Sequence, residues 1–133
     1  MATIRSMAAL EVGDPAVSHA FYKSLGFGTL GEWFPDNLVT IIVQKGDVTV
    51  LLQKSEKPAV NQGLGVYIYV DDADALHADL TAKGTKGLSP MEDMFYGCRE
   101  FGIHDPDGHE LIFGTNRGTP PHANGLGPDR GEG

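Results

Sequence analysis

The sequence predicts an α+β fold made of two consecutive βαβββ modules. The first observation is an internal repeat, because equivalent residues recur 58 positions apart: Val12 with Val70, Asp14 with Asp72, and Gly26 with Gly84. The second is that apolar residues alternate with other residues just before each aspartate, which is typical of a strand with two different faces. The third is that short strand-like runs separated by turn residues follow each expected helix.

The first module is expected over about residues 5–55. Its first strand ends at Val12, after which Asp14 and Pro15 have the residue types of a helix N-cap and first helical residue. Gly26 is expected to end this helix. Strand-like runs follow at about residues 29–34, 38–44 and 48–53, separated by turn-forming residues at 35–37 and 45–47. The order is therefore strand, helix and three strands.

The second module is expected over about residues 62–115 and repeats this order. Alternating apolar residues end at Val70, Asp72 caps the helix, and Gly84 ends it. The run after Gly84 is poorly defined, whereas strands are clear at 98–104 and 110–114, on either side of a turn at 105–108. Residues 1–115 thus form one domain, and the Gly- and Pro-rich residues 116–133 are predicted to be a flexible tail.

Composition narrows the classes of partner. The net charge of -8 argues against nucleic acid, whose phosphates are bound by concentrated Lys and Arg, and is compatible with a cationic ligand. No apolar run is long enough to span a membrane and no secretion signal is evident, so a cytoplasmic location is expected. Cys98 is the only cysteine, which excludes an intrachain disulfide, and it is expected to be a small packed residue.

Several short motifs carry a resemblance to a known family. They are Val12–Pro15 with Phe21–Tyr22 and Leu25–Phe27, then Val70–Asp72, Tyr96–Phe101 and Asp105–His109. Together they resemble the glyoxalase, bleomycin resistance protein and extradiol dioxygenase superfamily, also called vicinal oxygen chelate proteins, over about residues 5 to 115. The resemblance implies that the modules form a curved mixed-sheet cup around a cavity, with the helices on the outer face.

The resemblance also implies where a metal would be bound. Metal-dependent members place His, Gln or Glu at four positions, which in this sequence are Met7, Gln53, Gly65 and Ile112. Only Gln53 offers an oxygen donor, and divalent cations need several donors. We therefore expect no metal and no cofactor. The five histidines, His19, His77, His104, His109 and His122, are expected to be solvated surface residues.

The alternate face of the strands is expected to line the cup with apolar, aromatic and acidic side chains, which suits a small-molecule pocket. The candidate ligand-binding residues are Trp33, Phe34, Gln53, Tyr67, Tyr69, Phe95, Tyr96, Arg99, Glu11 and Glu110. Tyr96 precedes Gly97 where bleomycin resistance proteins have a stacking Trp. Arg99 and Glu100 are adjacent in a strand, so only one should point inward, and the sequence leaves open which. Glu11 and Glu110 are also candidates for a catalytic base and acid.

These features favour a metal-free protein that resembles bleomycin resistance proteins and sequesters a planar, cationic antibiotic in a groove of a homodimer. The alternative is a glyoxalase-like or dioxygenase-like enzyme, a lyase or isomerase, acting on a small carbonyl or aromatic substrate. Two further interpretations stay open. The inward side chains could simply fill the cup of a partner-binding module, and Trp33 with Phe34 could form a hydrophobic dimer rim. The sequence does not separate a dimer made by exchange of modules from one made by side-by-side packing.

Overall fold

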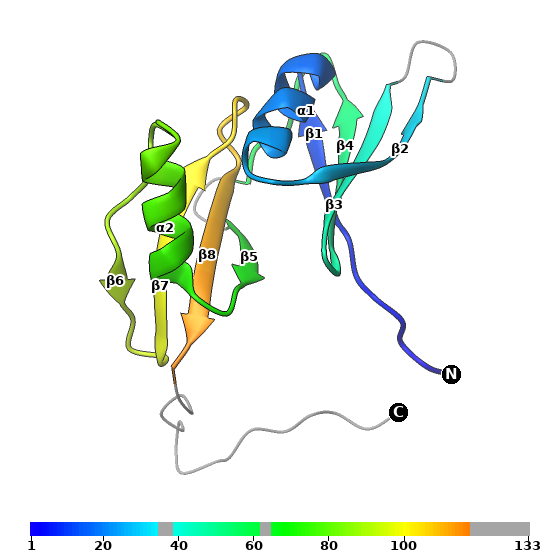
Figure 1. The fold of residues 1–133 in the computed structure, drawn as a ribbon. Helices are drawn as coiled ribbons and strands as arrows, with labels where there is room; N and C mark the ends of the chain where they lie inside the picture. The colour runs from blue at the N-terminus through cyan, green and yellow to red at the C-terminus, as the bar shows by residue number, and fades with distance from the viewer. Residues whose placement is uncertain (35–38, 62–64, 118–133) are drawn as a thin grey trace.

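The computed structural model describes residues 1–34, 39–61 and 65–117, which form two similar modules (Figure 1). The first contains β1 (Ala8–Val12), α1 (Pro15–Ser24), β2 (Gly28–Trp33), β3 (Thr40–Lys45) and β4 (Val48–Lys54). The second contains β5 (Gly65–Tyr69), α2 (Ala73–Ala82), β6 (Glu92–Asp93), β7 (Cys98–His104) and β8 (Glu110–Asn116). The predicted order of elements is therefore confirmed in both halves.

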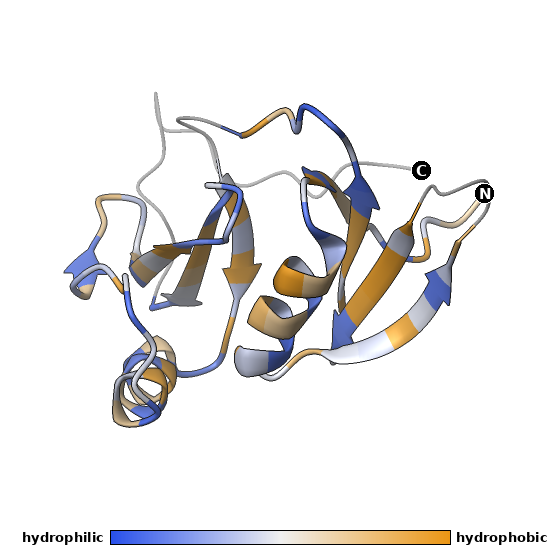
Figure 2. Cartoon of the chain, turned by 90° about the horizontal axis from the view of Figure 1, so that it is seen from above, coloured by the Kyte–Doolittle hydropathy of each residue, from blue (hydrophilic) through white to orange (hydrophobic). Residues whose placement is uncertain are grey.

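Each module has one four-stranded mixed sheet. The strand orders are β1-β4-β3-β2 and β5-β8-β7-β6. In each sheet the first strand pairs in parallel with the fourth, and the other neighbours are antiparallel. Each helix lies on one side of its own sheet (Figures 1 and 2). The α+β class with tandem βαβββ modules is confirmed, and the two sheets are open.

The repeat is visible in how the helices begin and end. The Asp14 carboxylate accepts hydrogen bonds from the backbone N–H groups of Ala16 and Val17, and the Asp72 carboxylate accepts one from Ala75. Beyond the helix ends, Gly26 and Gly84 have φ values of 96° and 82°, in the left-handed region that glycine tolerates best. Equivalent residues of the two modules therefore cap the start and follow the end of each helix in the same way.

We expect the Asp14→Ala substitution to lower the free energy of unfolding by about 1 kcal/mol, because two N–H groups of the first helical turn lose their acceptor. Urea denaturation would measure this loss. Asp14→Asn keeps an acceptor at the same position and should retain most of the stability. Equal losses in the two variants would contradict a capping role for the side chain.

The hydrophobic core contains the sides of the sheets that the helices contact, α1 on β3 and β4 and α2 on β7 and β8. The buried residues include Val12, Val50, Leu52 and Tyr22 of the first module and Leu80 and Leu111 of the second, and all of them belong to one apolar cluster. These strand residues all belong to one alternating set, which leaves the other face of each sheet free of its own helix. We call these the open faces; they are where the candidate site is found.

The two modules are joined by polar contacts, of which the one between Tyr22 and Asp105 is buried. The turn between β7 and β8 approaches α1, and the Asp105 carboxylate accepts a hydrogen bond from the Tyr22 hydroxyl at 3.0 Å. Asp107 accepts hydrogen bonds from the Gly13 N–H at 2.9 Å and from the Ser18 hydroxyl at 3.2 Å. Burial, together with the Asp105 carboxylate, raises the pKa of Tyr22 well above its usual value, so the phenol stays protonated and donates.

His109 corrects one expectation, because it is 1% exposed and not a solvated surface residue. Its Nε2 lies 2.6 Å from the backbone carbonyl oxygen of Glu11, which can only accept, so Nε2 carries the proton. Its Nδ1 lies 3.4 Å from the backbone nitrogen of Asn61, which donates to it. His109 therefore links the first strand, the inter-module segment and the second sheet.

Some boundaries differ from those predicted. β8 continues to Asn116, one residue into the predicted tail, because Asn116 pairs with Cys98 of β7. The rest of that tail from residue 118, and the predicted turn at 35–37, lie outside the described residues. Cys98 is buried, as expected. None of the helices in the described ranges has the length and hydropathy to cross a membrane.

Candidate functional site

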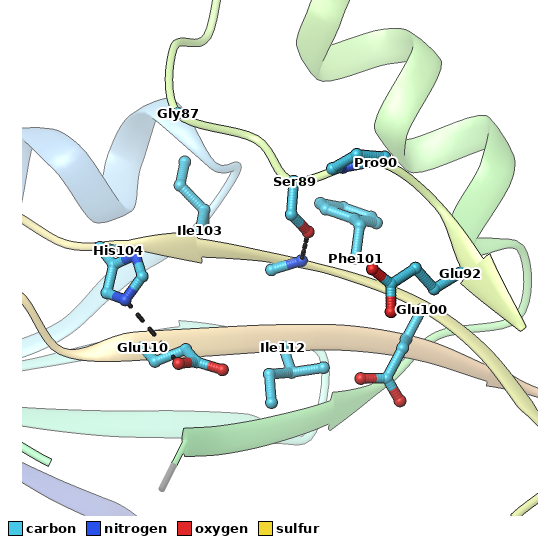
Figure 3. Close-up of a pocket in the computed structure, with 11 residues that line it drawn as sticks. Gly87, Ser89, Pro90, Glu92, Glu100, Phe101, Ile103, His104, Glu110 and Ile112 are labelled. Atoms are coloured by element: carbon cyan, nitrogen blue, oxygen red, sulfur yellow. Dashed lines mark hydrogen bonds and ion pairs between the residues drawn. The ribbon is translucent and has the colours of Figure 1, made fainter. Parts of the chain in front are cut away.

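A recess of about 350 Å³ opens beside β7 in the second module (Figure 3). Its lower wall is the open face of the sheet, where Ile112 of β8 lies between Glu110 of β8 and Glu100 of β7. The residues that line it are Gly87, Ser89, Pro90, Glu92, Glu100, Phe101, Gly102, Ile103, His104, Glu110 and Ile112. The volume suits a small organic group.

Glu100 is the most strongly held of the acidic residues in this recess. The Tyr67 hydroxyl donates to Glu100 Oε1 at 3.1 Å, and the Tyr96 hydroxyl donates to the same oxygen. Burial, followed by hydrogen bonding to Glu100, raises the pKa of Tyr96 to about 12. The pKa of Tyr67 is also raised, first by burial and then by hydrogen bonds with Cys98 and Glu100. Both phenols therefore remain protonated donors at neutral pH.

The Tyr67 ring covers a glycine on the neighbouring strand. A Cβ at Gly114 would lie 2.6 Å from Tyr67 Cζ, which is closer than real Cβ contacts. The absence of a side chain at Gly114 therefore lets Tyr67 lie flat on the sheet and reach Glu100. The Tyr69 ring, from the same face of β5, is 4.9 Å from the Tyr67 ring, and Tyr69 is 68% exposed.

Two further carboxylates share the recess. Glu92 is paired with Glu100 in the register of β6 and β7, so the two side chains project from the same face. Glu110 has its Oε2 3.7 Å from His104 Nε2 (Figure 3). No Lys or Arg in the described ranges forms an ion pair with any of these three carboxylates. The recess therefore has a negative potential.

The other side of the recess comes from the run that the sequence left undefined. Ser89 bonds to Gly102 twice, because its N–H donates to the Gly102 carbonyl at 2.9 Å and its hydroxyl accepts from the Gly102 N–H at 2.7 Å. His77 Nε2 lies 2.9 Å from the Ser89 carbonyl. A few individual bonds of Ser89, rather than a regular strand, thus hold this segment, which explains why periodicity did not find it.

Arg99 lies on the opposite side of β7. Its Nε donates to Asp74 of α2 at 2.8 Å, and its Nη1 lies 3.3 Å from Asp93. Hydrogen bonding from Arg99 holds the pKa of the Asp74 carboxyl below its ordinary value. The question left open by the sequence is thereby answered, since Glu100 faces the recess and Arg99 does not. The apolar partners Phe101 and Ile103 alternate with Glu100 and Gly102, and this signal could have identified the inward residue.

The remaining aromatic candidates are dispersed. Phe95 and Tyr96 have ring centroids 5.1 Å apart, and Phe95 is 83% exposed. Trp33 lies over Gly31, where an added Cβ would be 2.9 Å from Trp33 Cζ3 and closer still to Cη2, and Trp33 is half exposed. Phe34 instead lines a different hollow beside α1. Trp33 is in β2, and β2 and β6 lie at opposite ends of the molecule, so one chain does not unite these aromatics (Figures 1 and 2).

The first-module candidates Glu11 and Gln53 lie opposite one another in the register of β1 and β4. The Glu11 carboxylate accepts a hydrogen bond from the Ala59 N–H at 2.7 Å, which ties it to the inter-module segment. Glu110 is instead paired with His104. Glu11 and Glu110 are the candidates for a catalytic base and acid. Their carboxylates therefore contact different groups, Glu11 the Ala59 N–H and Glu110 the His104 ring.

The four positions of the family's metal ligands do not fit a divalent cation. A Cβ at Gly65 would lie 3.1 Å from Ile112 Cδ1, so these two positions face each other, and neither supplies a donor atom. Met7 supplies no oxygen or nitrogen from its side chain, which leaves the Gln53 amide alone. Within residues 1–34, 39–61 and 65–117, no three His, Cys, Asp or Glu side chains are grouped as a metal site would require.

Comparison with known proteins agrees with this architecture. The family model of the Glyoxalase/Bleomycin resistance protein/Dioxygenase superfamily matches residues 5–113. No curated protein matches the chain.

Three of the similar solved structures are two binding proteins and one enzyme. A bleomycin-binding protein from bleomycin-producing Streptomyces verticillus, complexed with copper(II)-bleomycin, is 24% identical, with a TM-score of 0.68 over 92% of this chain and 99% of that one. A second bleomycin-binding protein, complexed with bleomycin, is 20% identical, with a TM-score of 0.69 over 86% and 99%. A lactoylglutathione lyase from Agrobacterium tumefaciens is 21% identical, with a TM-score of 0.64 over 88% and 96%. At these identities the likeness shows a fold that binding proteins and an enzyme share.

Proposed function

The chain belongs to the Glyoxalase/Bleomycin resistance protein/Dioxygenase superfamily, and on that premise we propose that it is a metal-free protein that sequesters a planar, cationic antibiotic. The observation that carries this proposal is the open face of the second sheet, which combines exposed aromatic rings with carboxylates that have no Lys or Arg partner in the described residues. The similarity to bleomycin-binding proteins supports the same function.

The aromatic residues suit a planar ligand. Tyr69 and Phe95 expose most of their surface, and Trp33 exposes half of its surface on the first module. Large aromatic side chains that remain this accessible commonly mark a binding surface, because stacking of a flat ligand would remove them from water. A planar heteroaromatic group fits them better than a compact aliphatic one.

The carboxylates suit a cationic ligand. Glu92, Glu100 and Glu110 surround one recess, and the chain as a whole carries a net charge of -8. A negative recess raises the local concentration of cations and orients them on approach. We therefore expect ligand affinity to fall as salt concentration rises.

A homodimer would complete the binding groove. Trp33 belongs to β2 and the Phe95–Tyr96 pair follows β6, and these two strands lie on opposite sides of the molecule (Figure 1), so a second copy is needed to bring a Trp33 close to a Tyr96. Two open sheet faces, one from each copy, would then enclose the ligand. Sedimentation equilibrium should give twice the mass of the 14.2 kDa chain.

Titration with bleomycin, both metal-free and copper(II)-loaded, tests the proposal. Trp33 is the only tryptophan, so its fluorescence reports on its surroundings without interference. We expect saturable quenching with a dissociation constant of roughly 10 μM or lower. Trp33→Ala, followed by calorimetry because the fluorophore is lost, should weaken binding about tenfold or more.

A matched control for that substitution is Leu30→Ala, another exposed residue of β2, which should change the affinity little. Absence of quenching at roughly 100 μM bleomycin would count against this antibiotic class. If Trp33→Ala and Leu30→Ala weaken binding equally, stacking on Trp33 is not the reason for affinity.

The second candidate function is a glyoxalase-like enzyme, which the similarity to a lactoylglutathione lyase favours. The donor set described above does not fit the metal that such chemistry uses in this family, so a metal would have to be held elsewhere. Elemental analysis of the purified protein separates the two candidates. About one equivalent of a transition metal per chain would favour the enzyme.

A further inference from the structure

We infer that Glu100 is the specificity-determining residue of the recess, that it binds an ammonium or amidinium group of the ligand, and that Tyr67 and Tyr96 position its carboxylate. This inference rests on the proposed small-molecule-binding function and names the group that the site selects. It also places the cationic part of the ligand on the second module, away from Glu11 and Gln53.

The geometry leaves one oxygen of Glu100 available. Both phenols donate to Oε1, and no donor in the described part of the chain is bonded to Oε2. An ionised carboxylate can accept about four hydrogen bonds, so its capacity is only partly used. Charge-assisted bonds from a cationic N–H are the strongest ones that the free oxygen could make.

The carboxylate is also held in place before any ligand arrives. Tyr67 lies against Gly114, and Tyr96 belongs to a tight turn in which the Gly97 N–H donates to the Met94 carbonyl at 3.0 Å. Both phenols donate to the same carboxylate oxygen, and the raised pKa values of Tyr67 and Tyr96 keep these donors protonated. Little conformational entropy would be lost when a ligand binds, which strengthens binding.

The other carboxylates are less suited to this role. Glu110 lies 3.7 Å from His104 Nε2, and Glu11 accepts the Ala59 N–H. Glu92 is exposed on a strand of two residues, and neither a hydrogen bond nor an ion pair holds its side chain within the described ranges. These residues contribute to the negative potential, whereas Glu100 offers a fixed acceptor.

The space beside Glu100 accommodates more than the charged group. Ile112 gives the recess an apolar wall (Figure 3), and Gly102, which also lines the recess, adds no side chain. A ligand that carries its cationic nitrogen on a small apolar or aromatic body therefore fits both parts of the recess.

A matched pair of probes tests the inference. 2-Naphthylmethylamine and 2-naphthylmethanol have the same aromatic body, but the first carries an ammonium group and the second a neutral hydroxyl. Isothermal titration at neutral pH and low salt should show that the native protein binds the amine about tenfold or more tightly than the alcohol. In Glu100→Gln this preference should disappear, while binding of the alcohol changes little.

The positioning role of the tyrosines has its own readout. The Tyr67→Phe, Tyr96→Phe double variant retains both rings and the charge of Glu100. A reduced amine preference with unchanged alcohol binding would therefore identify the two hydroxyl groups as positioning groups.

Glu56→Gln is the charge control, because Glu56 is 92% exposed and pairs only with Lys54 at 4.0 Å in the described chain. That control should keep the full preference. Thermal unfolding of every variant verifies that it folds. Glu100→Asp serves as a second variant at this position: it keeps the charge on a shorter side chain, and the variant should lose part of the amine preference.

The outcomes are distinguishable from those of the proposed function. Retention of the amine preference in Glu100→Gln, or failure of the native protein to prefer or bind the amine, overturns the inference about Glu100 even if bleomycin binds. Loss of the preference in Glu100→Gln supports it, even if bleomycin does not bind to the native protein. In that case the antibiotic class would be wrong and the cation site would stand.

Discussion

Replacement of Asp105 by alanine should lower the free energy of unfolding by about 3–5 kcal/mol, the largest stability effect that we expect of any single substitution here. The carboxylate is 5% exposed and accepts hydrogen bonds from the Tyr22 hydroxyl and from the backbone N–H groups of Asp107 and His109. Its removal leaves buried donors without an acceptor, and each such group costs about 1–3 kcal/mol. Urea denaturation, monitored by circular dichroism, would measure the loss.

Two controls separate this effect from the mere loss of a charge. Asp71→Ala removes an exposed carboxylate and should change stability by less than about 0.5 kcal/mol. Asp105→Asn keeps one oxygen acceptor and should have an intermediate effect. A loss below about 1 kcal/mol in Asp105→Ala would mean that water replaces the carboxylate, and that the contact between Tyr22 and the β7–β8 turn does not hold the modules together.

Much of the fold could be predicted because local chemistry and the repeat agree. Asp14 and Asp72 are capping residues in the structure as in the sequence, and the strand at 98–104 has the predicted bounds. The segment between α2 and β7 could not be predicted, since β6 has only two residues and Ser89 is bonded to Gly102 once through its backbone N–H and once through its hydroxyl. Such contacts join residues far apart in sequence and leave no periodic pattern.

The candidate site was predicted in part, for a similar reason. Alternation correctly placed Tyr67 and Tyr69 on one face of β5 together with Glu110 and Ile112 of β8. The sequence analysis left open whether Arg99 or Glu100 points inward; alternation with the buried Phe101 and Ile103 places Arg99 on the helix side, where Asp74 binds it. His109 was wrongly expected at the surface because its partners, the Glu11 carbonyl and the Asn61 N–H, come from distant parts of the chain.

A methyl group added at Gly114 should disturb the site more than any other small change, because this glycine determines where Tyr67 lies. In Gly114→Ala the new Cβ would be 2.6 Å from Tyr67 Cζ and 3.0 Å from Cε1, so the ring must rotate away. Rotation breaks the hydrogen bond from Tyr67 to Glu100. We expect a loss of about 1–3 kcal/mol in unfolding free energy, the usual cost of overpacking, and a weaker preference for the amine probe.

The cause of that effect can be isolated by a double-mutant cycle. If the clash with Tyr67 is responsible, Gly114→Ala should cost much less in a Tyr67→Ala background than in the native protein, because the ring that it strikes is absent. Gly102→Ala provides a matched comparison on the adjacent strand, since its Cβ would meet the Leu111 carbonyl oxygen at an ordinary 3.4 Å, and it should cost less than about 1 kcal/mol. Equal costs for Gly114→Ala in both backgrounds would show that the backbone of β8, and not the Tyr67 ring, needs the glycine. The amine preference of the variant would then be expected to survive, since Tyr67 could still donate to Glu100.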